Sequence, residues 1–102
     1  MKQIRHKFNA IPVILDNIHF ASKKEAAYYQ QLVIRQRAGN VIFFLRQVAL
    51  HLPGKVKYIV DFVVFEADQT VHFVDVKGMR TPLYIAKKKI AEGIYPITIE
   101  EV

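Results

Sequence analysis

Two consecutive apolar stretches that each contain an acidic residue place the strongest constraint on how this chain can fold. The first is YIVDFVVF and the second is VHFVDVKG. Both are rich in the β-branched and aromatic residues that favour strands, and a short polar segment at residues 67–69 separates them. We therefore predict a β-hairpin with strands over residues 57–66 and 71–77, the second closed by Gly78.

The length of the loop in this hairpin decides how the two acids lie relative to each other. If residues 67–69 form the loop, Asp61 lies directly opposite Asp75, with Cβ atoms about 4.5–5.5 Å apart. A loop one residue shorter would instead put the two acids on opposite faces of the sheet. In the first register two carboxylates face each other within an apolar sheet, which is destabilising unless a positive charge lies between them.

Two kinds of positive group fit that position. Side chains two apart on a strand share a face, so Lys77 is able to form a salt bridge with Asp75. A divalent cation such as Mg²⁺ or Mn²⁺ fits better, because hard cations prefer carboxylate oxygens. A purely structural interpretation, with Lys77 and backbone N–H groups as the only partners, would leave one carboxylate unpaired. We therefore expect a metal site at Asp61 and Asp75.

Ahead of the central hairpin, local signals predict a small hairpin, a helix and a further strand. Residues 11–20 form the small hairpin, because Asp16-Asn17 tolerates the left-handed conformations of a tight turn. Ser22 caps a helix that ends at Gly39-Asn40. The strand over residues 41–50 follows.

Behind the central hairpin, a second helix and a last strand complete the domain. Thr81-Pro82 is a helix cap followed by a first-turn proline, and Gly93 is expected to end the helix. The helix shows apolar residues at helical spacing, namely Leu83, Ala86 and Ile90. A strand over residues 97–102 closes the chain. The order predicts one α/β or α+β domain over residues 1–102, with a central mixed sheet flanked by helices.

Composition excludes several classes of site and suggests a cytoplasmic protein. The chain has no cysteine, which excludes disulfides, thiolate metal sites and thiol nucleophiles. No apolar run is long enough to span a bilayer, and the N-terminus does not resemble a signal peptide, so we expect no membrane contact. The histidines show no metal-ligand spacing, so we expect surface or turn positions rather than a zinc site; they are His6, His19, His51 and His72.

The net charge of +6 comes from fifteen Lys and Arg residues against nine Asp and Glu residues. The basic residues form three groups, Lys2, Arg5 and Lys7, then Lys23 and Lys24, then Lys87, Lys88 and Lys89. Such groups are typical of proteins that bind polyanions. Solvated helix faces explain them equally well, so the charge alone does not decide between the two.

The order of these motifs resembles the PD-(D/E)XK nuclease signature. Asp61 matches the first acid, and Asp75-Val76-Lys77 matches the acid-x-Lys element. Together with IHFASKKEAAYY, LRQVAL and LYIAKKKIAEGIYP, they are similar to a family of small phage and prophage endonucleases, related to the phage endonuclease I type of Holliday-junction resolvase. The resemblance runs from about Asn17 onward. It departs at Val60, where the signature has proline, and in having Asp as the middle acid.

The resemblance implies a restriction-endonuclease-like αβββαβ core and a metal-dependent DNA endonuclease. Asp61 and Asp75 would be ligands of Mg²⁺, or of Mn²⁺ in its place, with the Val76 carbonyl as a third ligand and Glu25 as a further acid from the first helix. Lys77 would orient or deprotonate the attacking water, or stabilise charge in the transition state. The products would carry a 5′-phosphate and a 3′-hydroxyl.

Two of the implied site residues also have structural interpretations. Glu25 forms a capping box with Ser22, which could account for it, yet it shares a helical face with Tyr29 and Leu32, which should point inward. Gln47 either holds water or phosphate as a member of the catalytic site, or occupies the exposed face of its strand.

The expected partner is DNA. Candidate phosphate contacts lie at the start of the first helix and along the second; they are Lys23, Lys24, Tyr84, Lys87 and Lys88. Phosphate contacts read little sequence, which favours branched DNA such as a Holliday junction as substrate. One active site per chain predicts a homodimer for symmetric cutting of two strands. The alternatives are a non-catalytic nucleic-acid-binding module on the same fold and a structural protein of a phage particle or replisome.

Overall fold

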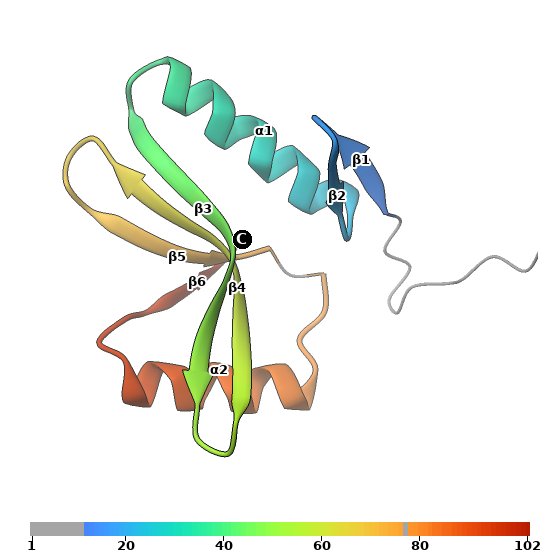
Figure 1. Ribbon diagram of the computed structural model, residues 1–102, viewed down its shortest axis with the longest axis vertical. Helices are drawn as coiled ribbons and strands as arrows, with labels where there is room; N and C mark the ends of the chain where they lie inside the picture. The colour runs from blue at the N-terminus through green and yellow to red at the C-terminus, as the bar shows by residue number, and fades with distance from the viewer. Residues whose placement is uncertain (1–11, 77) are drawn as a thin grey trace, which may run out of the picture.

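The computed structural model describes residues 12–76 and 78–102. Its elements follow the predicted order: β1 (Val13–Leu15), β2 (Ile18–Phe20), α1 (Lys23–Arg37), β3 (Val41–Leu52), β4 (Val56–Glu66), β5 (Val71–Asp75), α2 (Pro82–Ile94) and β6 (Ile99–Glu101). The protein is therefore an α+β domain preceded by an N-terminal hairpin, as predicted (Figure 1). Lys77 and the N-terminal group of Lys2, Arg5, His6 and Lys7 lie outside the described residues.

The main sheet has the strand order β3-β4-β5-β6. Both β3–β4 and β4–β5 are antiparallel and β5–β6 is parallel, so the sheet is mixed, as predicted. The long β3–β4 hairpin runs through the whole molecule, with α1 beside its upper half and α2 across its lower half (Figure 1). No helix among the described residues is long and apolar enough to cross a membrane.

Local capping and turn signals act where the sequence places them. Asp16 and Asn17 have φ angles of 52° and 61°, as a tight left-handed hairpin turn requires. The Ser22 hydroxyl accepts a hydrogen bond from the Glu25 N–H at 3.1 Å, so the first half of the predicted capping box forms. The predicted start of α1 is therefore confirmed.

Several element ends differ from the prediction, and two of these differences have a clear physical reason. β5 ends at Asp75 rather than at residue 77, because the Val76 N–H donates to the Asp61 side chain instead of extending the ladder. α2 continues through Gly93, because one glycine costs a helix only about 1 kcal/mol; Pro96 follows just after the helix and excludes its continuation. The final strand is also shorter than predicted, at Ile99–Glu101.

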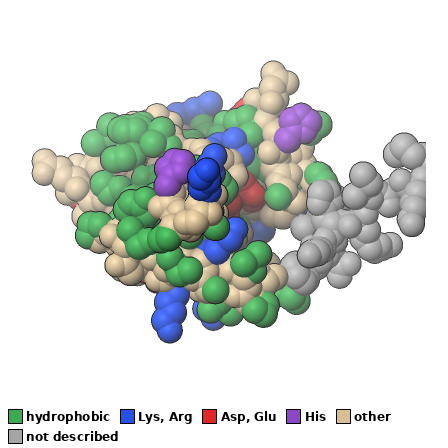
Figure 2. All heavy atoms as spheres, turned by 60° about the horizontal axis from the view of Figure 1, so that its bottom comes forward, with side chains coloured by type: hydrophobic (Ala, Val, Ile, Leu, Met, Phe, Trp, Pro, Cys, Tyr) green, Lys and Arg blue, Asp and Glu red, His purple; other side chains and the backbone are tan. Residues whose placement is uncertain are grey.

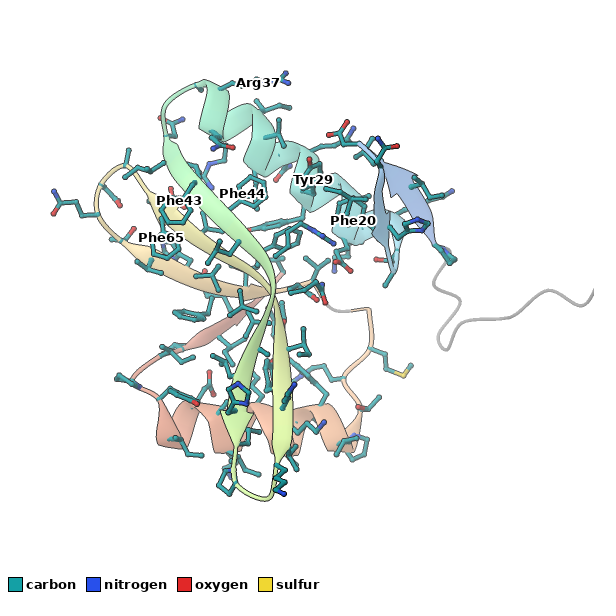
Figure 3. All side chains as sticks on the ribbon, in the orientation of Figure 1. Phe20, Tyr29, Arg37, Phe43, Phe44 and Phe65 are labelled. Atoms are coloured by element: carbon teal, nitrogen blue, oxygen red, sulfur yellow. The ribbon has the colours of Figure 1, made fainter. Side chains whose placement is uncertain are left out.

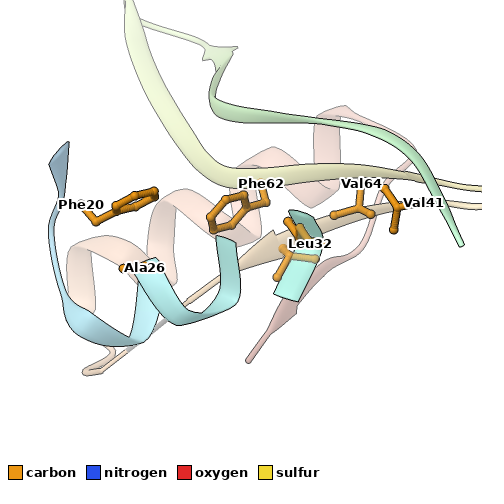
Figure 4. Close-up of a cluster of buried hydrophobic side chains, with 7 residues drawn as sticks. Phe20, Ala26, Leu32, Val41, Phe62 and Val64 are labelled. Carbon is orange, nitrogen blue, oxygen red and sulfur yellow. The ribbon is translucent and has the colours of Figure 1, made fainter. Parts of the chain in front are cut away.

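Two separate clusters of buried side chains hold the helices against the sheet. The cluster under α1 consists of Phe20, Ala26, Leu32, Val41, Phe62, Val64 and Val74 (Figure 4). Aromatic rings extend it toward the N-terminal hairpin, with the Phe20 and Tyr29 centroids 5.0 Å apart (Figure 3). The cluster under α2 consists of Leu52, Tyr58, Val60, Val63, Ala91 and Ile99.

The β3–β4 hairpin changes its buried face halfway along. Val60 packs under α2 while Phe62, two residues later, packs under α1, although side chains two apart on a regular strand share a face. The paired residues skip Gln47 and Asp61 at the same point, and Gln47 has a φ of 53°. We call this feature, centred on Gln47 and Asp61, the strand bend. Because of this bend, Tyr58 and Val60 face the same cluster as Val63 rather than the cluster that contains Phe62 and Val64.

The predicted apolar stripe of α2 faces outward. Leu83 is 65% exposed and Ile90 is 46% exposed, whereas Ala91 on the adjacent face is fully buried. Helical spacing identified the stripe correctly but not its partner, because the residues of α2 that pack on the cluster are Ala91 and the half-buried Tyr84. Tyr95, directly after the helix, packs on the same cluster. On the face seen in Figure 2, hydrophobic side chains cover a broad area around a few basic ones.

Candidate functional site

The two acids of the central hairpin lie opposite each other at the strand bend. The β4–β5 ladder pairs Phe62 with Val74, so the next opposed positions are Asp61 and Asp75. The register predicted with residues 67–69 as the loop is therefore confirmed. Of the two hairpin registers that the sequence allowed, the structure has the one in which Asp61 lies opposite Asp75.

Each of these carboxylates accepts a hydrogen bond from the backbone of the other strand. The Asp61 N–H donates to Asp75 Oδ1 at 3.1 Å, and the Val76 N–H donates to Asp61 Oδ2 at 2.9 Å. The expectation that burial alone would leave one carboxylate without a partner is therefore wrong. Backbone donors freed by the end of the ladder offset the repulsion between the two acids.

Asp75 is fully buried and has a second donor from the α2 side of the sheet. The Tyr58 hydroxyl donates to Asp75 Oδ2. Burial, followed by this hydrogen bond, raises the pKa of Tyr58 far above its ordinary value. Sequence reasoning missed Tyr58, because only the strand bend places it beside Asp75.

A further tyrosine carries the polar contacts from Tyr58 toward the surface. The Tyr84 ring lies 6.1 Å from the Tyr58 ring, and its hydroxyl donates to Glu101 Oε2 at 2.6 Å. Burial and the Glu101 hydrogen bond raise the pKa of Tyr84. Arg80 forms an ion pair with the same Glu101 oxygen at 3.2 Å. Tyr84, predicted as a DNA contact, thus lies beside Tyr58 and donates to Glu101.

On the α1 side, an amide joins Asp61 to the predicted helix acid. Gln47 Nε2 lies 3.2 Å from Glu25 Oε2 and 3.4 Å from Asp61 Oδ1. Glu25 is only 5% exposed and Leu32 on the same helical face is buried, so that face points inward as predicted. The structure therefore joins Glu25 to Asp61 through Gln47, and Asp75 adjoins this group through the Asp61 backbone N–H.

The described part of the site suits a cation with few protein ligands. Within residues 12–76 and 78–102, no three His, Cys, Asp or Glu side chains converge closely enough to hold a metal ion. Mg²⁺ commonly needs only one or two carboxylates beside water and phosphate oxygens. A carboxylate oxygen that accepts one hydrogen bond keeps a lone pair. Asp61 and Asp75 supply two such carboxylates, and Gln47 joins Asp61 to Glu25.

The basic residues predicted to contact DNA lie in two places. Lys23 and Lys24 are exposed at the start of α1. On α2, Lys87 Nζ lies 3.4 Å from the Lys57 carbonyl, and Lys88 forms an ion pair with Glu92 at 3.8 Å. The α2 lysines are therefore partly engaged within the chain, whereas those of α1 begin the helix that carries Glu25.

The remaining histidines lie away from these acids. His19 and His51 are exposed on β2 and β3, as predicted for surface residues. His72 is half-buried on β5, where its Nδ1 lies 2.5 Å from Glu100 Oε2.

The fold and site together define a class: a small α+β domain with paired acids at a bend in a mixed sheet. The chain belongs to the DUF1064 family, described as a protein of unknown function, whose model matches residues 5–99. A comparison with curated proteins found no match. Family membership thus covers almost the whole chain.

Proposed function

We propose that this protein is a metal-dependent DNA endonuclease of the PD-(D/E)XK type. The observation that carries the proposal is the reciprocal pairing of Asp61 and Asp75, each held by a backbone N–H of the opposite strand at 2.9 or 3.1 Å. Apolar residues at these positions would stabilise a sheet better than two acids. Their presence at a bend, next to Gln47 and Glu25, favours a site selected for chemistry.

Each residue of the site has a role in this proposal. Asp61 and Asp75 hold Mg²⁺ or Mn²⁺, with the Val76 carbonyl as a further ligand, and Tyr58 fixes the orientation of Asp75. The chemistry supplied by a divalent ion in such a site is a bound water of lowered pKa and positive charge beside the phosphate. Gln47 holds Glu25 against Asp61. Lys77 remains the predicted residue that orients or deprotonates the attacking water.

The substrate in this proposal is branched DNA. The exposed lysines at the start of α1 are suited to hold sugar-phosphate backbone, which carries little sequence information. Selection by DNA shape, as at a Holliday junction, therefore fits better than selection by sequence. The enzyme would act in the cytoplasm of a bacterial host and be encoded by a phage or prophage.

A homodimer is part of the proposal. Cutting two strands symmetrically with one site per chain requires twofold symmetry. The outward stripe of α2, which includes Leu83 and Ile90, supplies apolar surface that a second copy would cover.

The test compares cleavage of a labelled four-way junction, a flap and a linear duplex in Mg²⁺, in Mn²⁺ and in EDTA. The wild type should cut branched DNA only with a divalent ion, and Asp75→Asn should lower the rate on the order of 100-fold or more. Asp68→Asn is the matched control, because it makes the same charge change at an exposed loop acid. Direct Mn²⁺ binding, measured by electron paramagnetic resonance, should weaken in Asp75→Asn and not in the control.

The outcomes separate the proposal from its alternative. If Asp75→Asn cuts as well as the wild type, the assignment of Asp75 is wrong. If the wild type binds DNA in EDTA but cuts no substrate with either metal, the protein is a non-catalytic nucleic-acid-binding module.

A further inference from the structure

Arg46 of β3 lies beside the acids and has no role in the nuclease signature. Its guanidinium carbon lies 4.6 Å from the centroid of the Phe20 ring, a cation–π contact that fixes the side chain against the α1 cluster. The next residue along the strand is Gln47, at the strand bend. Arg46 therefore enters the site from the same strand that supplies the bridging amide.

The hydrogen-bonding capacity of Arg46 is not fully used within the described residues. Its Nε–H is buried and has no hydrogen-bond partner among them. Its closest described anion is Glu25, with Nη2 3.8 Å from Oε2, which is an ion-pair distance and too long for a hydrogen bond. An enclosed N–H without an acceptor destabilises the folded state, and buried polar groups are rarely left in that condition.

The contacts with Phe20 and Glu25 leave the Arg46 Nε–H without an acceptor among the described residues. Methionine would also pack on the Phe20 ring, and it would leave no N–H unpaired. Glu25 is already held by Gln47 at 3.2 Å. A positive group with unused donors at the edge of a cluster of acids is instead suited to an incoming anion.

We infer that Arg46 binds a phosphate oxygen of the nucleic-acid strand that enters the acid site. A guanidinium presents its N–H groups as a planar fork that matches two phosphate oxygens, whereas a lysine ammonium acts as a point charge. Its charge also counters that of Glu25, Asp61 and Asp75, which would otherwise repel a phosphate. The identity of the anion rests on the proposed function; the existence of the anion subsite does not require cleavage.

The test measures DNA affinity in EDTA, where no cleavage occurs, by fluorescence anisotropy over a series of salt concentrations. Arg46→Met should weaken binding roughly tenfold at low salt and reduce the slope of log affinity against log salt by about 1, because one phosphate contact is lost. Arg46→Lys should restore the slope but not the full affinity. Arg37→Met is the control, because it removes the same charge at the end of α1 that lies away from Phe20 (Figure 3). It should leave the DNA affinity and the salt slope closer to the wild-type values.

A purely structural role for Arg46 gives a different result. Arg46→Met and Arg46→Lys would then change the unfolding temperature while the DNA affinity of the folded variants, verified by circular dichroism, stays at the wild-type value. That result would overturn the inference. If the wild type cuts no DNA but the Arg46 variants change DNA affinity as expected, the proposed nuclease is refuted and the Arg46 subsite remains supported. A wild-type protein that binds no DNA would refute both.

Discussion

Replacing Tyr58 with phenylalanine tests how strongly the buried acid depends on its hydroxyl donor. The change keeps the ring that packs with Val60 and Ala91 in the cluster under α2. It removes only the O–H that donates to Asp75 Oδ2. Asp75 has no exposed surface, so its Oδ2 loses the hydroxyl donor within a buried environment.

The expected loss of stability follows from the charge and burial of the acceptor. A hydrogen bond to a charged group contributes about 1.5–3 kcal/mol, and a buried carboxylate that loses a donor falls at the upper end. A domain of this size unfolds with a total free energy of about 5–15 kcal/mol. Since each kcal/mol changes the Tm of a small domain by about 4–8 °C, Tyr58→Phe should lower it by roughly 6–24 °C.

Tyr29→Phe is the matched control for this prediction. The Tyr29 hydroxyl also donates to a carboxylate, Asp16 Oδ2 at 3.0 Å, but that pair is exposed to solvent. Urea and thermal unfolding should therefore show a loss of less than about 1 kcal/mol for this variant. Equal losses for Tyr29→Phe and Tyr58→Phe, or a Tyr58→Phe protein within about 0.5 kcal/mol of wild type, would refute the reasoning.

Three further predictions address the strand bend, the hairpin loop and the dimer. Because Gln47 has a left-handed φ, the Gln47→Gly variant should be more stable than the Gln47→Ala variant by about 1 kcal/mol in urea unfolding. In a regular strand the order would be the reverse. An alanine variant as stable as the glycine variant would contradict the bend. The hydrogen bond from the Thr70 hydroxyl lowers the pKa of Asp68, so this hydrogen bond stabilises the fold above the unfolded pKa of about 4 and the effect is lost as the pH falls through the folded pKa. Thr70→Val should therefore raise the Asp68 pKa in an NMR titration. An unchanged Asp68 pKa would exclude this cause. Ile90→Glu should convert a dimer to a monomer in light scattering while Ile34→Glu, on the exposed face of α1, should not; a monomeric wild type would remove the dimer from the proposal.

Local sequence signals predicted the element order and limited the acid register to two possibilities, because each depends on neighbouring residues. Asp16-Asn17 and Ser22 determine a turn and a helix start by their own backbone and side-chain chemistry. The register of Asp61 and Asp75 followed from the length of one loop. These features need no knowledge of the rest of the molecule.

The partners of the acids could not be predicted in the same way. LRQVAL contains no glycine or proline, so nothing in the stretch marks Gln47 as the residue that leaves the strand conformation. The bend is a tertiary feature, visible only in the change of buried face between Val60 and Phe62. Tyr58 and Arg46 enter the site only as a consequence of that tertiary arrangement, as does the outward position of the Ile90 stripe.

The strand bend is therefore the condition for the site as a whole. In a straight hairpin with the observed register, Tyr58 would share a face with Phe62, and Asp75 would lie on the other face. Because the buried face changes between Val60 and Phe62, Tyr58 reaches the α2 side, where Asp75 accepts its hydroxyl. The same change leaves Gln47 directed toward Glu25 and Asp61. A substitution that straightens β3 at Gln47 should thus separate Asp75 from its donor and Asp61 from its bridging amide, even though neither acid is altered.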